Sequence, residues 1–146
     1  MSTNELSTQV NTNQVSIAED MAQANQFYYT GSLETKDDKK AFFNAIQNPD
    51  VQLRDHINKK IEVVNVYVAP VLLESSEEPG VQVQCPRIVL FGADGTSYTC
   101  VSVGVYNSLK TLFQTFGDPG EWDEPITVEV KQVSRGTNQL LTLKVC

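Results

Sequence analysis

The order of β-rich and helical segments in residues 59–146 constrains the fold of this chain most strongly. Five segments have the β-branched or alternating pattern of strands: 59–73, 81–91, 96–103, 126–133 and 140–145. Asp94-Gly95, between the second and third segments, is a strong signal for a two-residue hairpin. Between the third and fourth segments, apolar residues of 104–116 recur at helical spacing, which predicts an amphipathic helix.

Three strands, a helix and two strands follow one another in the order typical of the OB-fold, a partly open barrel that binds oligonucleotides or oligosaccharides. We therefore predict a mainly β fold with α: a five-stranded OB-fold barrel over residues 59–146, with a helix between strands 3 and 4.

The first 58 residues have a different character. Residues 1–25 are rich in Ser, Thr, Asn and Gln and are predicted to form a flexible, disordered tail. Residues 26–58 are predicted as a strand and helix extension, whose helix begins near Thr35 and stops at Asn48-Pro49. Spaced apolar residues in the tail lead us to expect self-association through it: Val10, Val15, Ile17 and Met21.

Patterns that carry catalysis are missing from the sequence. No phosphate-binding glycine loop occurs, and His56, the sole histidine, has no nucleophile beside it in a recognisable motif. Cys85, Cys100 and Cys146 are too widely spaced for a zinc site. We expect no enzyme activity, catalytic residue, metal, cofactor or small-molecule substrate. The sequence contains no apolar run of ~20 residues and no secretory signal, so we expect no membrane association and a cytoplasmic location.

The formal net charge of −7 argues against a nucleic-acid partner, because phosphates attract Lys and Arg. Binding depends on the local field, however, and the acidic residues gather in two loops. These loops contain Glu74, Glu77 and Glu78, and Asp118, Glu121, Asp123 and Glu124. A locally basic groove is therefore compatible with the composition.

Strand parity provides candidates for DNA contact. If Val66 and Val101 face inward, Tyr67 and Tyr98 share the outward surface, where bases can stack on them; the alternative is that they pack across strands. A bulge at Pro86 would aim Arg87 into the groove. The predicted nucleic-acid-binding residues are Tyr67, Arg87, Tyr98, Lys110, Lys131, Arg135 and Lys144. The alternative for each lysine is a solvated side chain. Trp122, between two acids, is interpreted as a lid on the barrel end.

From about residue 27 onward, the chain resembles the short single-stranded DNA-binding proteins of Gram-positive phages and conjugative plasmids, the plasmid-borne members most of all. The residues that carry the resemblance are 43–50 (FNAIQNPD), 55–58 (DHIN), 61–64 (IEVV), 104–105 (GV), Trp122 and 141–143 (LTL). The resemblance implies an OB-fold that binds single-stranded DNA without strong sequence preference, coating or protecting it during phage or plasmid replication or conjugative transfer. The alternative is an acidic protein–protein interaction module that recruits a DNA-processing factor.

Overall fold

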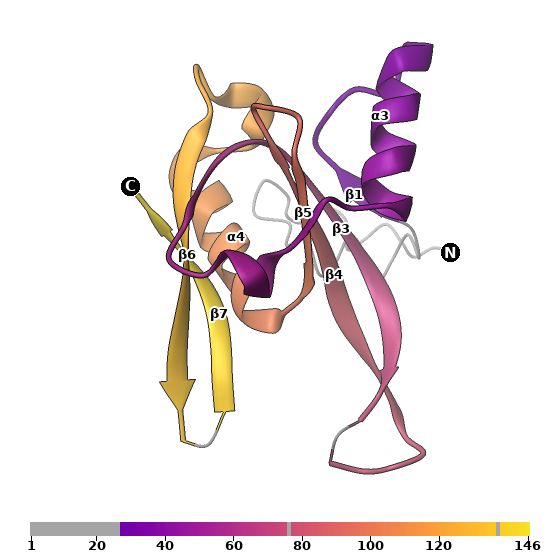
Figure 1. The fold of residues 1–146 in the computed structure, drawn as a ribbon, viewed down its shortest axis with the longest axis vertical. Coiled ribbons are helices and arrows are strands. Elements are labelled where there is room, and N and C mark those ends of the chain that lie inside the picture. The colour runs from indigo at the N-terminus through magenta and orange to yellow at the C-terminus, as the bar shows by residue number, and fades with distance from the viewer. Residues whose placement is uncertain (1–26, 76, 137) are drawn as a thin grey trace, which may run out of the picture.

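The computed structural model describes residues 27–75, 77–136 and 138–146 (Figure 1). Its elements are β1 (Tyr28–Tyr29), α3 (Lys36–Gln47), β2 (Val51–Gln52), the 3-10 helix η2 (Leu53–His56), β3 (Lys60–Glu74), β4 (Gln82–Gly92), β5 (Ser97–Val101), α4 (Val103–Phe116), the 3-10 helix η3 (Pro119–Glu121), β6 (Ile126–Arg135) and β7 (Asn138–Val145). The mainly β class with helices is confirmed.

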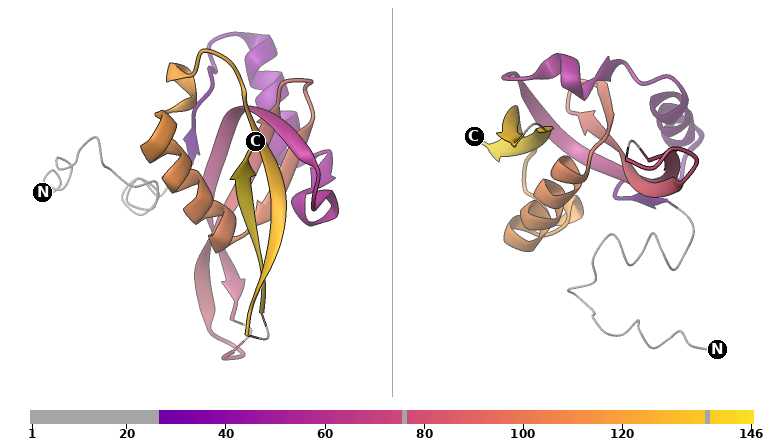
Figure 2. Two further views of the ribbon diagram at one scale, coloured as in Figure 1. Left: turned by 90° about the vertical axis from the view of Figure 1, so that its left-hand side faces the viewer. Right: turned by 90° about the horizontal axis from the view of Figure 1, so that it is seen from below.

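The strands form one mixed sheet in the order β2-β5-β4-β3-β6-β7, with β1 added to β3. Among the described residues, β7 pairs only with β6, whereas β5 pairs with β4 and β2. The edge strands of the sheet are thus β2 and β7. The sheet curls into a half-barrel, consistent with an OB-like fold (Figure 2). It has seven strands rather than the five expected, because β1 and β2 from the N-terminal extension join it.

Both long helices begin at side-chain caps that the sequence provides. Thr35 Oγ1 accepts a hydrogen bond from Asp38 N at 3.0 Å, and Ser102 Oγ accepts one from Val105 N at 3.1 Å. Gly117, with φ of +83°, ends α4 in a conformation that disfavours other residues. Between these ends, α4 packs one face against the half-barrel, with Val105, Leu109 and Leu112 buried.

Two separate apolar cores lie on opposite faces of the sheet. The larger one fills the half-barrel and includes Val66, Leu90 and Leu109. The smaller one packs α3 against the outer face, with Tyr67 and Val89 buried beneath it. Because both faces of central β3 and β4 are covered, the segments that pair there, 66–69 (VYVA) and 88–91 (IVLF), are apolar without interruption.

The expected inward and outward positions were partly wrong. A register shift between Val63 and Asn65 leaves Val64 half-buried, although we expected it in the core with Val66. In β5, Tyr98 lies in the interior core, whereas Val101 at the end of the strand and Val103, the first residue of α4, are exposed. Strand parity in Ser97–Val101 was ambiguous because apolar residues occur in both phases.

Candidate nucleic-acid interface

Cross-strand pairing gathers lysines on the outer face of β3, β6 and β7. Lys60 pairs with Glu129, and Glu129 pairs with Lys144, so the three side chains share one row. Lys131 lies two residues further along β6, and its Nζ is 3.7 Å from Glu129 Oε2. We call the surface of Lys60, Lys131 and Lys144 the cationic face. Glu129 and the exposed Glu62, two residues from Lys60 on β3, share this side, so the three lysines leave a small excess of positive charge.

The segment after η2 adds further cations beside this face. Asn58 N donates to Val130 O at 2.6 Å, and Val130 N donates to Lys59 O at 3.1 Å, so this segment runs along β6. Asn58 Oδ1 also accepts from Lys131 Nζ at 3.0 Å. Lys59 and the η2 residue Arg54 are both exposed. This segment therefore extends the positive surface beyond the sheet.

Sequence reasoning did not select Arg54, Lys59 or Lys60 as site residues. About seventy residues separate Lys60 from Lys131, and only the β3–β6 pairing brings them to one surface. The available signal was the Lys59-Lys60 doublet directly before a β-branched run.

Arg135 belongs to the same hairpin as the cationic face, because it ends β6 opposite Asn138. Lys144 is exposed, and the side chain of Lys131 is 39% exposed. Of the seven predicted residues, the fold therefore brings three onto one hairpin: Lys131, Arg135 and Lys144.

Arg87 lies elsewhere and supports the fold. Its Nη2 donates to Ile46 O, near the end of α3, at 2.7 Å, and its Nε donates to Thr99 Oγ1 at 3.4 Å. The expected bulge at Pro86 was wrong, because β3 and β4 pair without interruption there. Arg87 thus fastens α3 to the sheet.

The expectation that Tyr67 and Tyr98 share the outward surface was wrong. Tyr67 is in the outer core, with its ring centroid 5.6 Å from that of Phe42. Tyr98 is in the interior core, 4.8 Å from the ring of His56. Burial raises the pKa of both phenols above the usual range. Cross-strand packing, the alternative considered for both, accounts for these positions.

Lys110 and Trp122 have local partners. Lys110 Nζ lies 5.7 Å from the ring centroid of Tyr106 on α4. Trp122 packs against the interior core and donates from Nε1 to Gly117 O at 2.9 Å, as expected for a lid on the barrel end.

Aromatic stacking platforms are not part of the cationic face. Among the described aromatic residues, the exposed ones are Phe27, Phe43 and Phe116, which lie before β1 and on the two long helices. The face is therefore suited to phosphates, which ammonium groups bind without reading base identity.

Residues 21–146 match the family model for phage single-stranded DNA-binding proteins of the Phi29 type. The chain belongs to the phage single-stranded DNA-binding protein family. No curated protein and no solved structure gave a significant match. Membership in this family assigns single-stranded DNA as a partner class to a molecule whose overall charge is negative. It thereby gives the locally positive surface of β3, β6 and β7 a candidate role.

Two further properties of the described residues concern metals and membranes. No cluster of three or more His, Cys, Asp or Glu side chains suited to a metal ion occurs in this part of the chain. No helix in the same residues is long and apolar enough to cross a membrane.

Proposed function

We propose that this family member binds single-stranded DNA along the cationic face, with Arg135 and the η2 segment extending the contact. The observation that carries this proposal is the row of Lys60 and Lys144 across three adjacent strands. Phosphates of an extended strand pass along such a row, and each contact releases condensed counterions. Because lysines act as point charges, we expect little sequence preference.

The biological process is a further part of this proposal. A sequence-tolerant binder is suited to coating and protecting strands during phage or plasmid replication, or during conjugative transfer. The family match supports the phage connection, whereas the plasmid-borne type and the cytoplasmic location rest on the sequence.

We also propose self-association through residues 1–25, which lie outside the described residues. Linking subunits along one strand would raise affinity through avidity. Deleting residues 1–25 should preserve binding to short oligonucleotides and abolish assembly on long ones in light scattering. Unchanged assembly on long strands would refute this role.

The test of DNA binding is fluorescence anisotropy with a labelled oligo-dT at several salt concentrations. We expect affinity to fall linearly on a logarithmic salt scale, with weaker binding to duplex and similar affinities for oligonucleotides of other sequences. Absence of binding at low salt, or a preference for duplex, would refute the proposal.

The second candidate, an acidic module that recruits a DNA-processing factor, has one observation in its favour. The hairpin of β3 and β4 carries Glu74, Glu77 and Glu78 at its exposed end. A chain that bound no DNA but retained a protein partner would support this second function.

A further inference from the structure

The ends of β3 and β4 project from the sheet as a two-stranded arm, residues 70–86 (Figure 1). The arm contains no Lys or Arg, and its glutamates lie at the far end. Its exposed apolar side chains are Leu72 at 62%, Leu73 at 43%, Val81 at 44% and Val83 at 41%. Leu73 pairs with Val83, and Val81 lies two residues before Val83, so these three side chains share one face of the arm, whereas Leu72, paired with Gln84, lies on the opposite face. An uncovered apolar face of this kind is typical of a contact surface.

Two prolines determine how the arm can make a contact. Pro70 pairs with Pro86 at its base, and neither has an N–H group. Val66 forms hydrogen bonds with Thr30 on the edge of β3 that faces away from β4. Backbone nitrogens of every second residue in a strand lie on the same edge, so the nitrogen of Pro70, four residues further along, lies on that edge too. The base of the arm therefore resists the addition of another strand, so a contact made there has to use side chains.

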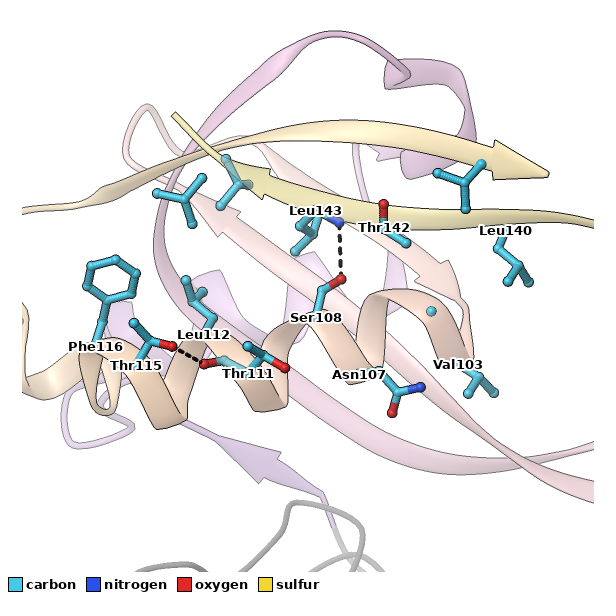
Figure 3. Close-up of a pocket in the computed structure, with 14 residues that line it drawn as sticks. Val103, Asn107, Ser108, Thr111, Leu112, Thr115, Phe116, Leu140, Thr142 and Leu143 are labelled. Atoms are coloured by element: carbon cyan, nitrogen blue, oxygen red, sulfur yellow. Dashed lines mark hydrogen bonds between the residues drawn. The ribbon is translucent and has the colours of Figure 1, made fainter. Parts of the chain in front are cut away.

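A complementary surface lies between α4 and β7, where the structure has a groove of about 620 Å³ (Figure 3). None of the residues that line it is charged. Several of its apolar side chains are exposed: Val103, Phe116, Val133 and Val145.

The backbone of β7 beside the groove already has partners. Leu143 N donates to Ser108 Oγ at 3.2 Å, and Gly104 packs directly on the carbonyl of Leu141. The groove is therefore suited to apolar side chains rather than to an added strand, which is also the only kind of contact that the arm offers at its base.

Cations border this uncharged groove. Lys144 lies between the lining residues Leu143 and Val145, and Lys131 is paired with the lining residue Thr142, so both lysines belong to the outer face of the hairpin next to the β7 edge of the groove. An apolar groove with lysines at its margin complements an apolar arm that ends in glutamates. α4 spans about 20 Å from Val103 to Phe116, long enough for the three apolar residues on one face of the arm.

We propose that the β3–β4 arm of one copy of this chain docks into the α4–β7 groove of a second copy. Leu73, Val81 and Val83 supply the apolar contact, and the glutamates approach Lys131 and Lys144. Each contact uses one arm and one groove, which are different surfaces, so the interface is heterologous. The proposal concerns the DNA-free protein and does not depend on the proposed DNA binding.

The test is sedimentation velocity of the full-length protein without DNA, over a concentration series at low and high salt. The arm variant is Leu73→Ser with Val83→Ser, and the groove variant is Thr111→Glu, which places a carboxylate in the groove from an exposed helical position. The matched control is Phe43→Ser, because Phe43 is an exposed apolar residue of α3 that belongs to neither the arm nor the groove.

We expect the wild type and the control to self-associate, more weakly at high salt, and each variant alone to lose at least tenfold in association constant. A mixture of the two variants retains one intact arm and one intact groove, so it should form dimers. A charge variant, Glu77→Lys with Glu78→Lys, should weaken association without altering any apolar residue.

A wild type that stays monomeric at all concentrations would overturn the proposal, as would variants that associate like the wild type or a mixture that stays monomeric. Loss of association in Phe43→Ser would overturn it too. Binding of the arm variant to a short oligo-dT, measured in parallel, separates this result from the proposed function: we expect its affinity to be unchanged.

Discussion

The β3–β4 arm and the β6–β7 hairpin are both antiparallel ribbons of one sheet, and they project in the same general direction in Figure 1. They differ in charge: residues 70–86 contain glutamates and no cation, whereas the other ribbon contains Lys131, Arg135 and Lys144. Two ribbons with the same backbone geometry therefore carry local charges of opposite sign. The net charge of −7 for the whole chain describes neither of them.

Their support differs as well. The β6–β7 hairpin packs against α4, where Ser108 and Gly104 contact β7. The arm has strand partners only within itself beyond Pro70 and Pro86 among the described residues. We infer that the supported ribbon presents a preorganised charge pattern, while the unsupported one is free to adapt to another surface.

The largest expected effect distinguishes a cysteine of the arm, Cys85, from one inside the half-barrel, Cys100. Burial raises the pKa of Cys100, inside the half-barrel, to about 12. At pH 9, a thiol with that pKa is only ~0.1% thiolate, so Cys100 should be alkylated on the order of 100-fold more slowly than Cys85 at the arm. Timed iodoacetamide labelling with peptide mass spectrometry measures both. Equal rates would show that the barrel opens as readily as the arm.

The same shift predicts a pH dependence of stability. Because the folded pKa is raised, the neutral thiol stabilises the fold fully below its unfolded value of about 9, and this contribution is lost as pH rises toward 12. Alkaline unfolding of Cys100→Ala should therefore show a smaller loss of stability over that range than the wild type. An identical pH profile for both proteins would contradict it.

The second expected effect tests the support of β7 by α4. A Cβ at Gly104 would collide with the carbonyl oxygen of Leu141. Gly104→Ala should lower the free energy of unfolding by about 2–3 kcal/mol, measured by urea denaturation. Gly120→Ala is the control, because a Cβ there meets nothing within 4 Å. Equal stability of the two variants would show that α4 does not hold the hairpin.

The third expected effect concerns the cationic face. Replacing Lys131 and Lys144 together with Ala should weaken binding to oligo-dT about tenfold and reduce the logarithmic salt slope by about 1.4, since each lost phosphate contact removes about 0.7. Lys36→Ala with Lys40→Ala, on exposed positions of α3, removes the same charge. If the α3 variant lost as much affinity, net charge rather than the hairpin would govern binding.

The smallest expected effect concerns the arm. Glu77→Gln with Glu78→Gln should raise the affinity for oligo-dT by at most about twofold, because both side chains are exposed and their fields are screened over ~10 Å. Anisotropy titrations at low salt would detect it. A large gain would mean that the arm lies along the DNA path, which would end the division of roles between the two ribbons.

The sequence by itself determined the elements of residues 59–146, because their signals are local. The run of β-branched residues in β3, the Asp94-Gly95 turn and the cap at Ser102 each act over a few neighbouring residues. The sequence also determines the family, because residues 21–146 match the model for phage single-stranded DNA-binding proteins.

Only the tertiary structure decided which faces those elements present. A register shift after Val63 and the burial of Tyr98 reversed expected positions, because a one-residue change in register exchanges the two faces of a strand. Arg87 donates a hydrogen bond to Ile46 O in α3. The pattern of residues in β4 could not predict this contact, because it depends on where α3 packs on the sheet. The cationic face needed Lys60 and Lys144 on adjacent strands, and charge gathered across long sequence separations is a property of pairing rather than of composition.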